Sequence, residues 1–331
     1  MRVDMHTHVI PPSLVAMAER PEGLFGVRRV GDVLVHPEGF QAPLDADFHD
    51  VDALLARMDA NGIDLSIVSI APPLFFYRLG AAAAIAFARE ANDAIAAMAA
   101  GSERLEALAH LPLQAPEAAA RELERAVGDL GMRGALIGTD AGETMLDEEP
   151  LEPLLATAAA LSVPLVLHPY FVGPKPRLEP FFFTNSIGNP LDTAIAAARL
   201  IHHGTLDRHP GLRVVLVHGG GYLPYQLGRL DHAFSVRPEA REIIERPPSA
   251  YLDRFWVDTL VHSDASLRFL ADLVGEERLL LGTDLPYDMA DRQPLERLDR
   301  IGLDADALGA VAGDLFAVDR LSEAGRGGRA G

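Results

Sequence analysis

The chain has 331 residues, enough for one large barrel or two ordinary domains, and its 49% hydrophobic and 23% charged residues are typical of a globular protein. It contains no cysteine, which excludes disulfides, thiolate metal sites and thiol nucleophiles. Its 48 acidic and 29 basic residues give a net charge of −19, which repels phosphate backbones and anionic membranes. We therefore expect neither nucleic acid nor a membrane as a partner.

The first residues, Met1–His6, lack the apolar core of a signal peptide. The alanine-rich stretch from Leu79 to Ala100 is apolar, but charged residues interrupt it, which favours a barrel helix over a membrane-spanning one. These features predict a soluble, cytoplasmic protein.

Short apolar runs alternate with helical segments along the chain. The runs are Val3–His8, Asp64–Ile70, Leu105–Leu111, Gly134–Gly138, Val163–His168, Arg213–His218, Phe255–Leu260 and Arg278–Thr283. The helical segments include Pro116–Leu130, Leu151–Leu161 and Leu191–His203. Eight such runs predict an α/β fold, a closed (β/α)8 TIM barrel, with a doubly wound sheet as the competing interpretation. Several runs are continuously apolar, as in strands that are buried on both faces.

We predict one barrel domain over residues 1–320. An irregular stretch at 11–47 is predicted to be a flap over one barrel mouth, with a small hairpin at Val27–His36 that turns around Gly31 and Asp32. A helix is predicted to begin near Asp50. The Gly/Arg-rich tail, 321–331, is predicted to be disordered.

The histidines lie at informative positions. His6 and His8 are two residues apart near the end of the first run, so both side chains point to the same side of a strand. His168 and His218 end the fifth and sixth runs, and Asp284 follows the eighth. Barrel enzymes gather catalytic residues from these strand ends on one face. Imidazoles with a carboxylate are a ligand set that suits zinc or a similar divalent ion.

A structural explanation competes with this one. A single histidine at a strand end is more often a hydrogen-bonded structural residue than a ligand. Two buried imidazoles on one side are harder to explain by packing, because each needs a polar partner. The pair His6 and His8 therefore carries more weight than any histidine alone.

Four motifs resemble those of a known family. They are Asp4–His8, Leu167–Pro169, Val217–Gly221 and Gly282–Pro286. They resemble the amidohydrolase superfamily, and within it the branch of non-oxidative decarboxylases typified by aminocarboxymuconate-semialdehyde decarboxylase. The similarity covers nearly the whole chain and includes 112–116, 225–229 and 235–238. The His-x-His pair alone would not be specific, since other metal-dependent barrels also begin with it.

The resemblance implies roles for particular residues. It implies one divalent metal, zinc with manganese as the other candidate, held by His6, His8, His168 and Asp284. It implies that His218 is the acid/base near the metal-bound water and not a ligand, with Asp284 also taking part in catalysis. It implies a homodimer in which Arg237 grips a substrate carboxylate in the neighbouring subunit's site.

The chain departs from the family pattern at the substrate pocket. A second carboxylate-binding arginine, expected near Phe40–Pro43, is absent, and Asn185 stands where an aromatic residue is expected. The only lysine, Lys175, lies in a proline-rich stretch past the fifth run, so the fourth run has no lysine that could bridge two metals. We therefore predict one metal and leave the substrate open.

Other polar residues have weaker signals. Asp258 and His262, at and beyond the end of the seventh run, could orient a metal ligand, whereas a structural hydrogen bond explains His110 equally well. The glycines after His218 have neither the Gly-x-Ser-x-Gly elbow of esterases nor the Lys-Ser/Thr of a phosphate loop, so we interpret them as a tight turn.

Three functions remain open at this stage. The first is non-oxidative decarboxylation of a small aromatic or enoic carboxylic acid, with a histidine exchanging a proton near neutral pH. The second is metal-dependent hydrolysis of an amide, lactone or carbon–carbon bond. The third is a non-catalytic binding or scaffolding barrel, which predicts no tightly held metal.

Overall fold

The computed structural model describes residues 1–37, 41–170 and 177–318. The predictions for Lys175, for Phe40 and for the tail 321–331 fall outside these ranges.

Parallel strands form the wall of a barrel. In the described residues they are β1 (Val3–Val9), β5 (Leu65–Ile70), β6 (Leu105–Ala107), β7 (Ala109–His110), β8 (Ala135–Ile137), β9 (Pro164–Leu167), β10 (Arg213–Leu216), β11 (Phe255–Asp258) and β12 (Leu279–Leu280). Neighbours in the wall follow chain order and pair in parallel. β6 and β7 are two pieces of the third barrel strand, interrupted at Leu108, whose backbone N–H donates to Val68.

The barrel is closed by contacts between its first and last strands. Met5 N–H donates to the carbonyl of Leu281 (2.9 Å), and Asp284 N–H donates to the carbonyl of His6 (2.8 Å). Thr7 and Leu285 form a further parallel bridge. A doubly wound sheet has open edges, so this closure confirms the predicted barrel and excludes the alternative.

Most strands are shorter than predicted, and the difference matters most at two of them. β10 ends at Leu216 and β12 at Leu280, although we expected them to reach His218 and Thr283. His218 and Asp284 have φ values of 55° and 63°, in the left-handed region, which a strand cannot accommodate. Both residues therefore lie in turns just past the strands and not on them.

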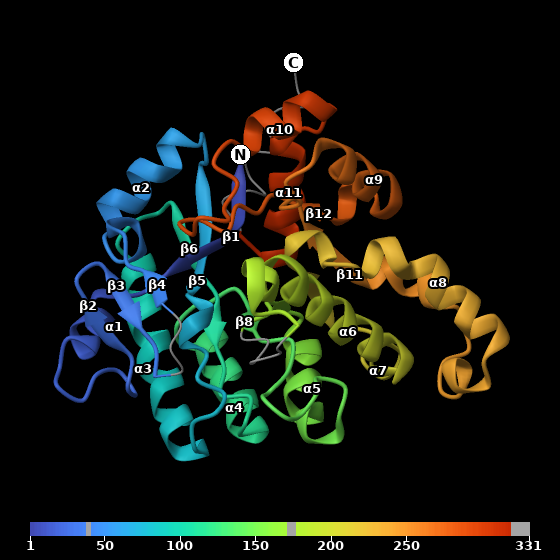
Figure 1. The fold of residues 1–331 in the computed structure, drawn as a ribbon, viewed down its shortest axis with the longest axis horizontal. Coiled ribbons are helices and arrows are strands. Elements are labelled where there is room, and N and C mark those ends of the chain that lie inside the picture. Colours follow the sequence, from blue (N-terminus) through green and yellow to red (C-terminus); the bar gives the residue numbers. More distant parts are fainter. Residues whose placement is uncertain (38–40, 171–176, 319–331) are drawn as a thin grey trace.

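Helices surround the strands. They are α1 (Pro12–Ala18), α2 (Val51–Ala60), α3 (Ala81–Ala99), α4 (Pro116–Gly128), α5 (Glu152–Leu161), α6 (Asn189–His202), α7 (Thr205–Arg208), α8 (Leu223–Val236), α9 (Asp264–Val274), α10 (Pro294–Ile301) and α11 (Ala305–Phe316). From α2 through α5 to α10 they follow one another around the strands in chain order (Figure 1). As predicted, α2 begins near Asp50, which precedes its first residue and whose carboxylate accepts hydrogen bonds from two backbone N–H groups of the first turn.

The segment between β1 and α2 forms a small antiparallel sheet beside α1 (Figure 1). β2 (Arg28–Val30) and β3 (Val33–Val35) make the predicted hairpin around residues 31–32. A third strand, β4 (Gln41–Pro43), pairs with β3 and was not predicted. It is three residues long, which is too short for an alternating pattern to be recognised.

The alanine-rich stretch forms α3, which buries Ala84, Phe87 and Ile95 and exposes its charged residues Arg89 and Glu90. Within the described ranges, no helix is both long enough and apolar enough to cross a lipid bilayer.

The first strand is held at its start by close packing of α11. A Cβ atom on Gly309 would lie 1.8 Å from the carbonyl oxygen of Met1, whereas a Cβ on Gly128, at the end of α4, would meet no atom within 4 Å. We predict that Gly309→Ala costs about 1–3 kcal/mol through overpacking, while Gly128→Ala is neutral or slightly stabilising. Thermal unfolding of the two variants measures the difference, and equal melting temperatures would contradict the packing described.

Candidate metal centre

Three imidazoles and one carboxylate meet at one end of the barrel. The rings of His6 and His8, on β1, have centroids 5.1 Å apart, and the ring of His168, just after β9, lies 5.2 and 5.1 Å from them. Oδ1 of Asp284 lies 3.4 Å from Nε2 of His6 and 3.1 Å from Nε2 of His8. One ligand atom from each of the four residues lies within 4.8 Å of the others. The sequence-predicted residues are thus brought together.

The other ring nitrogen of each histidine is already engaged. Nδ1 of His6 contacts Oδ2 of Asp258 (2.7 Å), and Nδ1 of His168 contacts the carbonyl of Pro169 (2.5 Å). Nδ1 of His8 is 3.3 Å from the hydroxyl of Ser69. These contacts orient all three rings so that Nε2 faces the centre of the cluster.

The inward-facing atoms lack partners in the protein. Among the described residues, Nε2 of His6, His8 and His168 and Oδ1 of Asp284 are buried without a hydrogen bond of acceptable geometry. Buried polar atoms without partners are costly, and four of them facing one point are rare in a folded protein. One divalent cation would serve all four, so the donor set fits a metal ion.

Burial and neighbouring charges shift the pKa values of all four residues of the cluster. Burial raises the pKa of a carboxyl group, but the nearby imidazoles of His6, His218 and His8 outweigh it, and the pKa of Asp284 lies well below its ordinary value. Burial lowers the pKa of His8, and it lowers that of His168 much further. Burial alone would lower the pKa of His6 as well. The carboxylates of Asp284 and Asp258 have the larger effect, so the pKa of His6 is raised. An ionised Asp284 and neutral His8 and His168 can accept a cation directly, whereas any proton on Nε2 of His6 would have to leave when the cation binds.

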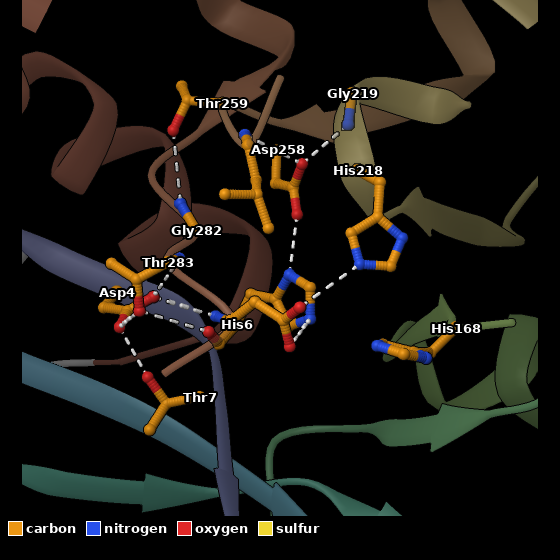
Figure 2. A network of polar contacts seen from close by, with 12 residues as sticks. Asp4, His6, Thr7, His168, His218, Gly219, Asp258, Thr259, Gly282 and Thr283 are labelled. Carbon is orange, nitrogen blue, oxygen red and sulfur yellow. Dashed lines mark hydrogen bonds and ion pairs between the residues drawn. The ribbon is translucent and has the colours of Figure 1, made fainter. Parts of the chain in front are cut away.

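Asp4 fixes the segment that carries Asp284. Its carboxylate is buried and accepts hydrogen bonds from the backbone N–H groups of His6 (3.1 Å) and Thr283 (3.1 Å). It also accepts from the hydroxyls of Thr7 and Thr283. Figure 2 shows Asp4 bridging β1 and the Thr283 segment in this way. Because Asp284 follows Thr283, this network places one candidate ligand against the strand that carries two others.

Asp258 links the cluster to the turn that carries His218. One of its carboxylate oxygens contacts His6, and the other accepts from the backbone N–H of Gly219 at 2.7 Å (Figure 2). The expectation that Asp258 orients a ligand agrees with this geometry. The glycines make the turn as predicted: Gly219 has a φ of 62°, and a Cβ there would lie 2.3 Å from Val261.

His218 lies beside the cluster but is not part of the convergent group. Its Nε2 is 3.6 Å from Oδ2 of Asp284, on the side of that carboxylate away from Oδ1. Its ring is 5.0 Å from that of His168, and its side chain is 17% exposed, more than any of the three convergent histidines. His218 and Asp284 both line a cavity of about 640 Å³, so His218 can meet a bound molecule.

Arg237 does not reach this site in its own chain. It lies just past α8, its side chain is 65% exposed, and its guanidinium pairs with Glu239. It lines neither the cavity beside His218 nor the one beside the flap. Its assignment to a neighbouring subunit's site stays a prediction.

The remaining candidates divide into two kinds. His110 is buried against the rings of Phe75 and Tyr77, and burial lowers its pKa to about 3, which fits a neutral structural residue. His262 lines the cavity beside His218, so it is placed to contact a ligand.

Ser69 was not identified from the sequence as a partner of His8, because a serine within an apolar strand gives no distinctive signal.

The amidohydrolase family model matches residues 3–314. The chain is 29% identical to the 2-amino-3-carboxymuconate-6-semialdehyde decarboxylase of Dictyostelium discoideum, over 91% of this chain and 86% of that protein. It is 34% identical to the gamma-resorcylate decarboxylase of Rhodococcus jostii, over 76% of this chain and 82% of that protein. The structure of a dihydroxybenzoic acid decarboxylase from Polaromonas, solved with manganese and the inhibitor 2-nitroresorcinol, superimposes with a TM-score of 0.76 at 25% identity, over 96% of this chain and 97% of that one.

The Asp4 network generates a prediction about metal affinity. Asp4→Ala removes the acceptor of four hydrogen bonds and frees the Asp284 segment, so we expect metal affinity to fall about 10–100-fold. Asp4→Asn should have a smaller effect, because its amide oxygen still accepts from the two backbone N–H groups. Competition with a chelator measures the affinity.

Glu106→Gln is the matched control, because Glu106 is a buried carboxylate on β6 that pairs with Arg133 away from the cluster. If the Asp4 and Glu106 variants bound metal equally well at equal loss of thermal stability, Asp4 would have only a general structural role.

Proposed function

Since the chain belongs to the amidohydrolase family, we propose that it is a metal-dependent decarboxylase acting on a small aromatic or enoic carboxylic acid. The observation that carries this proposal is the convergence of His6, His8, His168 and Asp284, with His218 beside them on a cavity. Relatives over most of the chain are named as decarboxylases of such acids, which supports the reaction type.

We infer one divalent ion per chain, with zinc favoured by the donor set. Three imidazole nitrogens and one carboxylate oxygen are ligands that zinc accepts in four-coordinate sites. The Polaromonas relative holds manganese, so Mn²⁺ is the other ion to test. Metal analysis of the purified protein, followed by reloading with each ion, distinguishes them.

The bound ion would act as a Lewis acid that polarises the substrate. His218 faces the cavity, where it can donate a proton to the carbon that carries the carboxylate. The new C–H bond leaves the conjugated framework of the substrate short of electrons, so that the framework becomes the electron sink. The C–C bond to the carboxylate then breaks, its electron pair returns to the framework, and CO₂ leaves. His218 regains its proton from solvent, so that in sum one carboxylate and one proton give CO₂ and the shortened product.

The two roles proposed for His218 and Asp284 are separable. His218→Ala should keep the metal and lose most turnover, whereas Asp284→Ala should lose both, because only Asp284 belongs to the convergent group. Loss of one acid/base group typically costs about 100–10,000-fold in rate. Metal content and turnover are measured on the same samples. His203→Ala serves as the control, since His203 is about half exposed and pairs only distantly with Asp147. A metal-free His218→Ala protein would make our assignment of roles wrong.

The reaction type is tested with the metal-loaded enzyme in water enriched in oxygen-18. We expect the organic product to have lost the mass of CO₂ and to contain no solvent oxygen. A product that carries solvent oxygen without CO₂ release would identify a hydrolase instead.

We further infer a homodimer in which Arg237 binds a substrate carboxylate in the partner's site. An arginine holds a carboxylate through two parallel hydrogen bonds, which lysine cannot reproduce. Arg237 is exposed at the end of α8, and apolar side chains are exposed on the same helix and on α6, namely Tyr225, Val236, Leu191 and Ile195. Exposed apolar side chains on these two helices are suited to a subunit interface.

Mixing two inactive variants tests this arrangement. Arg237→Ala keeps His218, and His218→Ala keeps Arg237, so a mixed dimer contains one complete site if Arg237 acts across the interface. Random assembly should then restore about one quarter of wild-type activity. No recovery, although mixed dimers form, would place Arg237 in its own chain's site or outside catalysis.

A further inference from the structure

The cavity beside His218 has a neighbour on the flap side. We call the first cavity, lined by His218, Asp284 and His262, the metal-side lobe, and its volume is about 640 Å³. We call the second, lined by Phe25, Gln41, Phe76, Tyr77 and Tyr170, the flap-side lobe, and its volume is about 520 Å³. Each volume alone lies in the range of small-molecule sites.

The two lobes share part of their walls. Asn185 and Asn189 line both of them. Asn189 begins α6, and Asn185 lies in the π-helical turn Thr184–Gly188 that precedes it. π-helical turns occur frequently at functional sites. A half-buried asparagine, Asn185, therefore lies in the wall that the two lobes share.

The walls of the flap-side lobe suit a flat apolar group. The rings of Phe25 and Phe76 have centroids 5.6 Å apart, and those of Tyr77 and Tyr170 lie 5.2 Å apart. Aromatic walls bind another ring by edge and face contacts and by burying its apolar area. The metal-side lobe offers the proton donor and the candidate metal ligands instead.

We propose that the two lobes form one substrate site, and that the substrate is an aromatic acid whose ring bears a further flat apolar ring. Its carboxylate end occupies the metal-side lobe, and its extension passes Asn185 into the flap-side lobe. Asn185 is then a specificity-determining residue. This inference rests on the proposed decarboxylase function, and adds to it the size and shape of the acid.

Two hydroxybenzoates of different length serve as probes. Calorimetric titration of the metal-loaded wild-type protein compares 2-hydroxybenzoate with 2-hydroxy-4-phenylbenzoate. Burial of the added ring should make the longer acid bind at least about tenfold more tightly. If the short acid binds and the longer one binds no better, the inference falls and the proposed function stands. If neither acid binds the metal-loaded protein, the proposed function falls and takes the inference with it.

Variants at the boundary locate the effect. Asn185→Phe should block the passage and reduce the ratio of the two affinities to within about threefold, since the added ring then stays in solvent. Asn185→Ser should keep the wild-type ratio. Ile187→Phe is the matched control, because Ile187 lies in the same turn but lines neither lobe.

A variant inside the flap-side lobe provides an independent test. Phe76→Leu removes one ring of the wall and should lower the affinity ratio, even if Asn185→Phe fails to fold. A wild-type ratio in Phe76→Leu, or in a folded Asn185→Phe protein, would overturn the proposal.

Discussion

The structure depends on four buried donor atoms that face one point. Nε2 of His6, His8 and His168 and Oδ1 of Asp284 are withdrawn from water, and none of them has a hydrogen-bond partner of acceptable geometry among the described residues. A buried polar atom without a partner destabilises a fold, and this chain places four together. A divalent cation bound at that point would contact all four atoms and remove the cost of burying them without partners. The cluster therefore indicates a metal centre and not a strained core.

The closing seam of the barrel is what brings the four atoms together. Asp284 lies in the turn after the last strand and His6 and His8 on the first strand, so they meet only because the chain after β12 pairs with β1. The seam carries few backbone hydrogen bonds, and the carboxylate of Asp4 on β1 adds two contacts across it, from the backbone N–H and the hydroxyl of Thr283. Asp258 makes a second link of this kind. Its carboxylate contacts the ring of His6 and accepts from the backbone N–H of Gly219, in the turn that carries His218. One hydrogen-bond network therefore holds the candidate metal ligands and the turn that carries His218.

Much of this arrangement could be predicted from the sequence. The continuous apolar runs and the spacing of His6 and His8 indicated the barrel and the shared direction of two imidazoles. The left-handed turns at His218 and Asp284 could not be predicted, because an apolar run does not show where the backbone leaves the strand. The sequence does place Asp4 on the same strand face as His6 and His8. Its role could not be predicted, because it depends on Thr283 from the other end of the chain. The predicted role of Arg237 depends on a second subunit, because in its own chain this side chain is exposed and pairs only with Glu239.

The central claim is that one ion binds to these four side chains. X-ray absorption spectroscopy of the metal-loaded protein tests it most directly, because the scattering of imidazole rings identifies histidine ligands around the ion. We expect one ion per chain with three imidazole ligands and a carboxylate oxygen, at nitrogen and oxygen distances of about 2.0–2.2 Å for zinc. An ion without imidazole ligands, or a protein that holds no ion after reloading, would contradict the account.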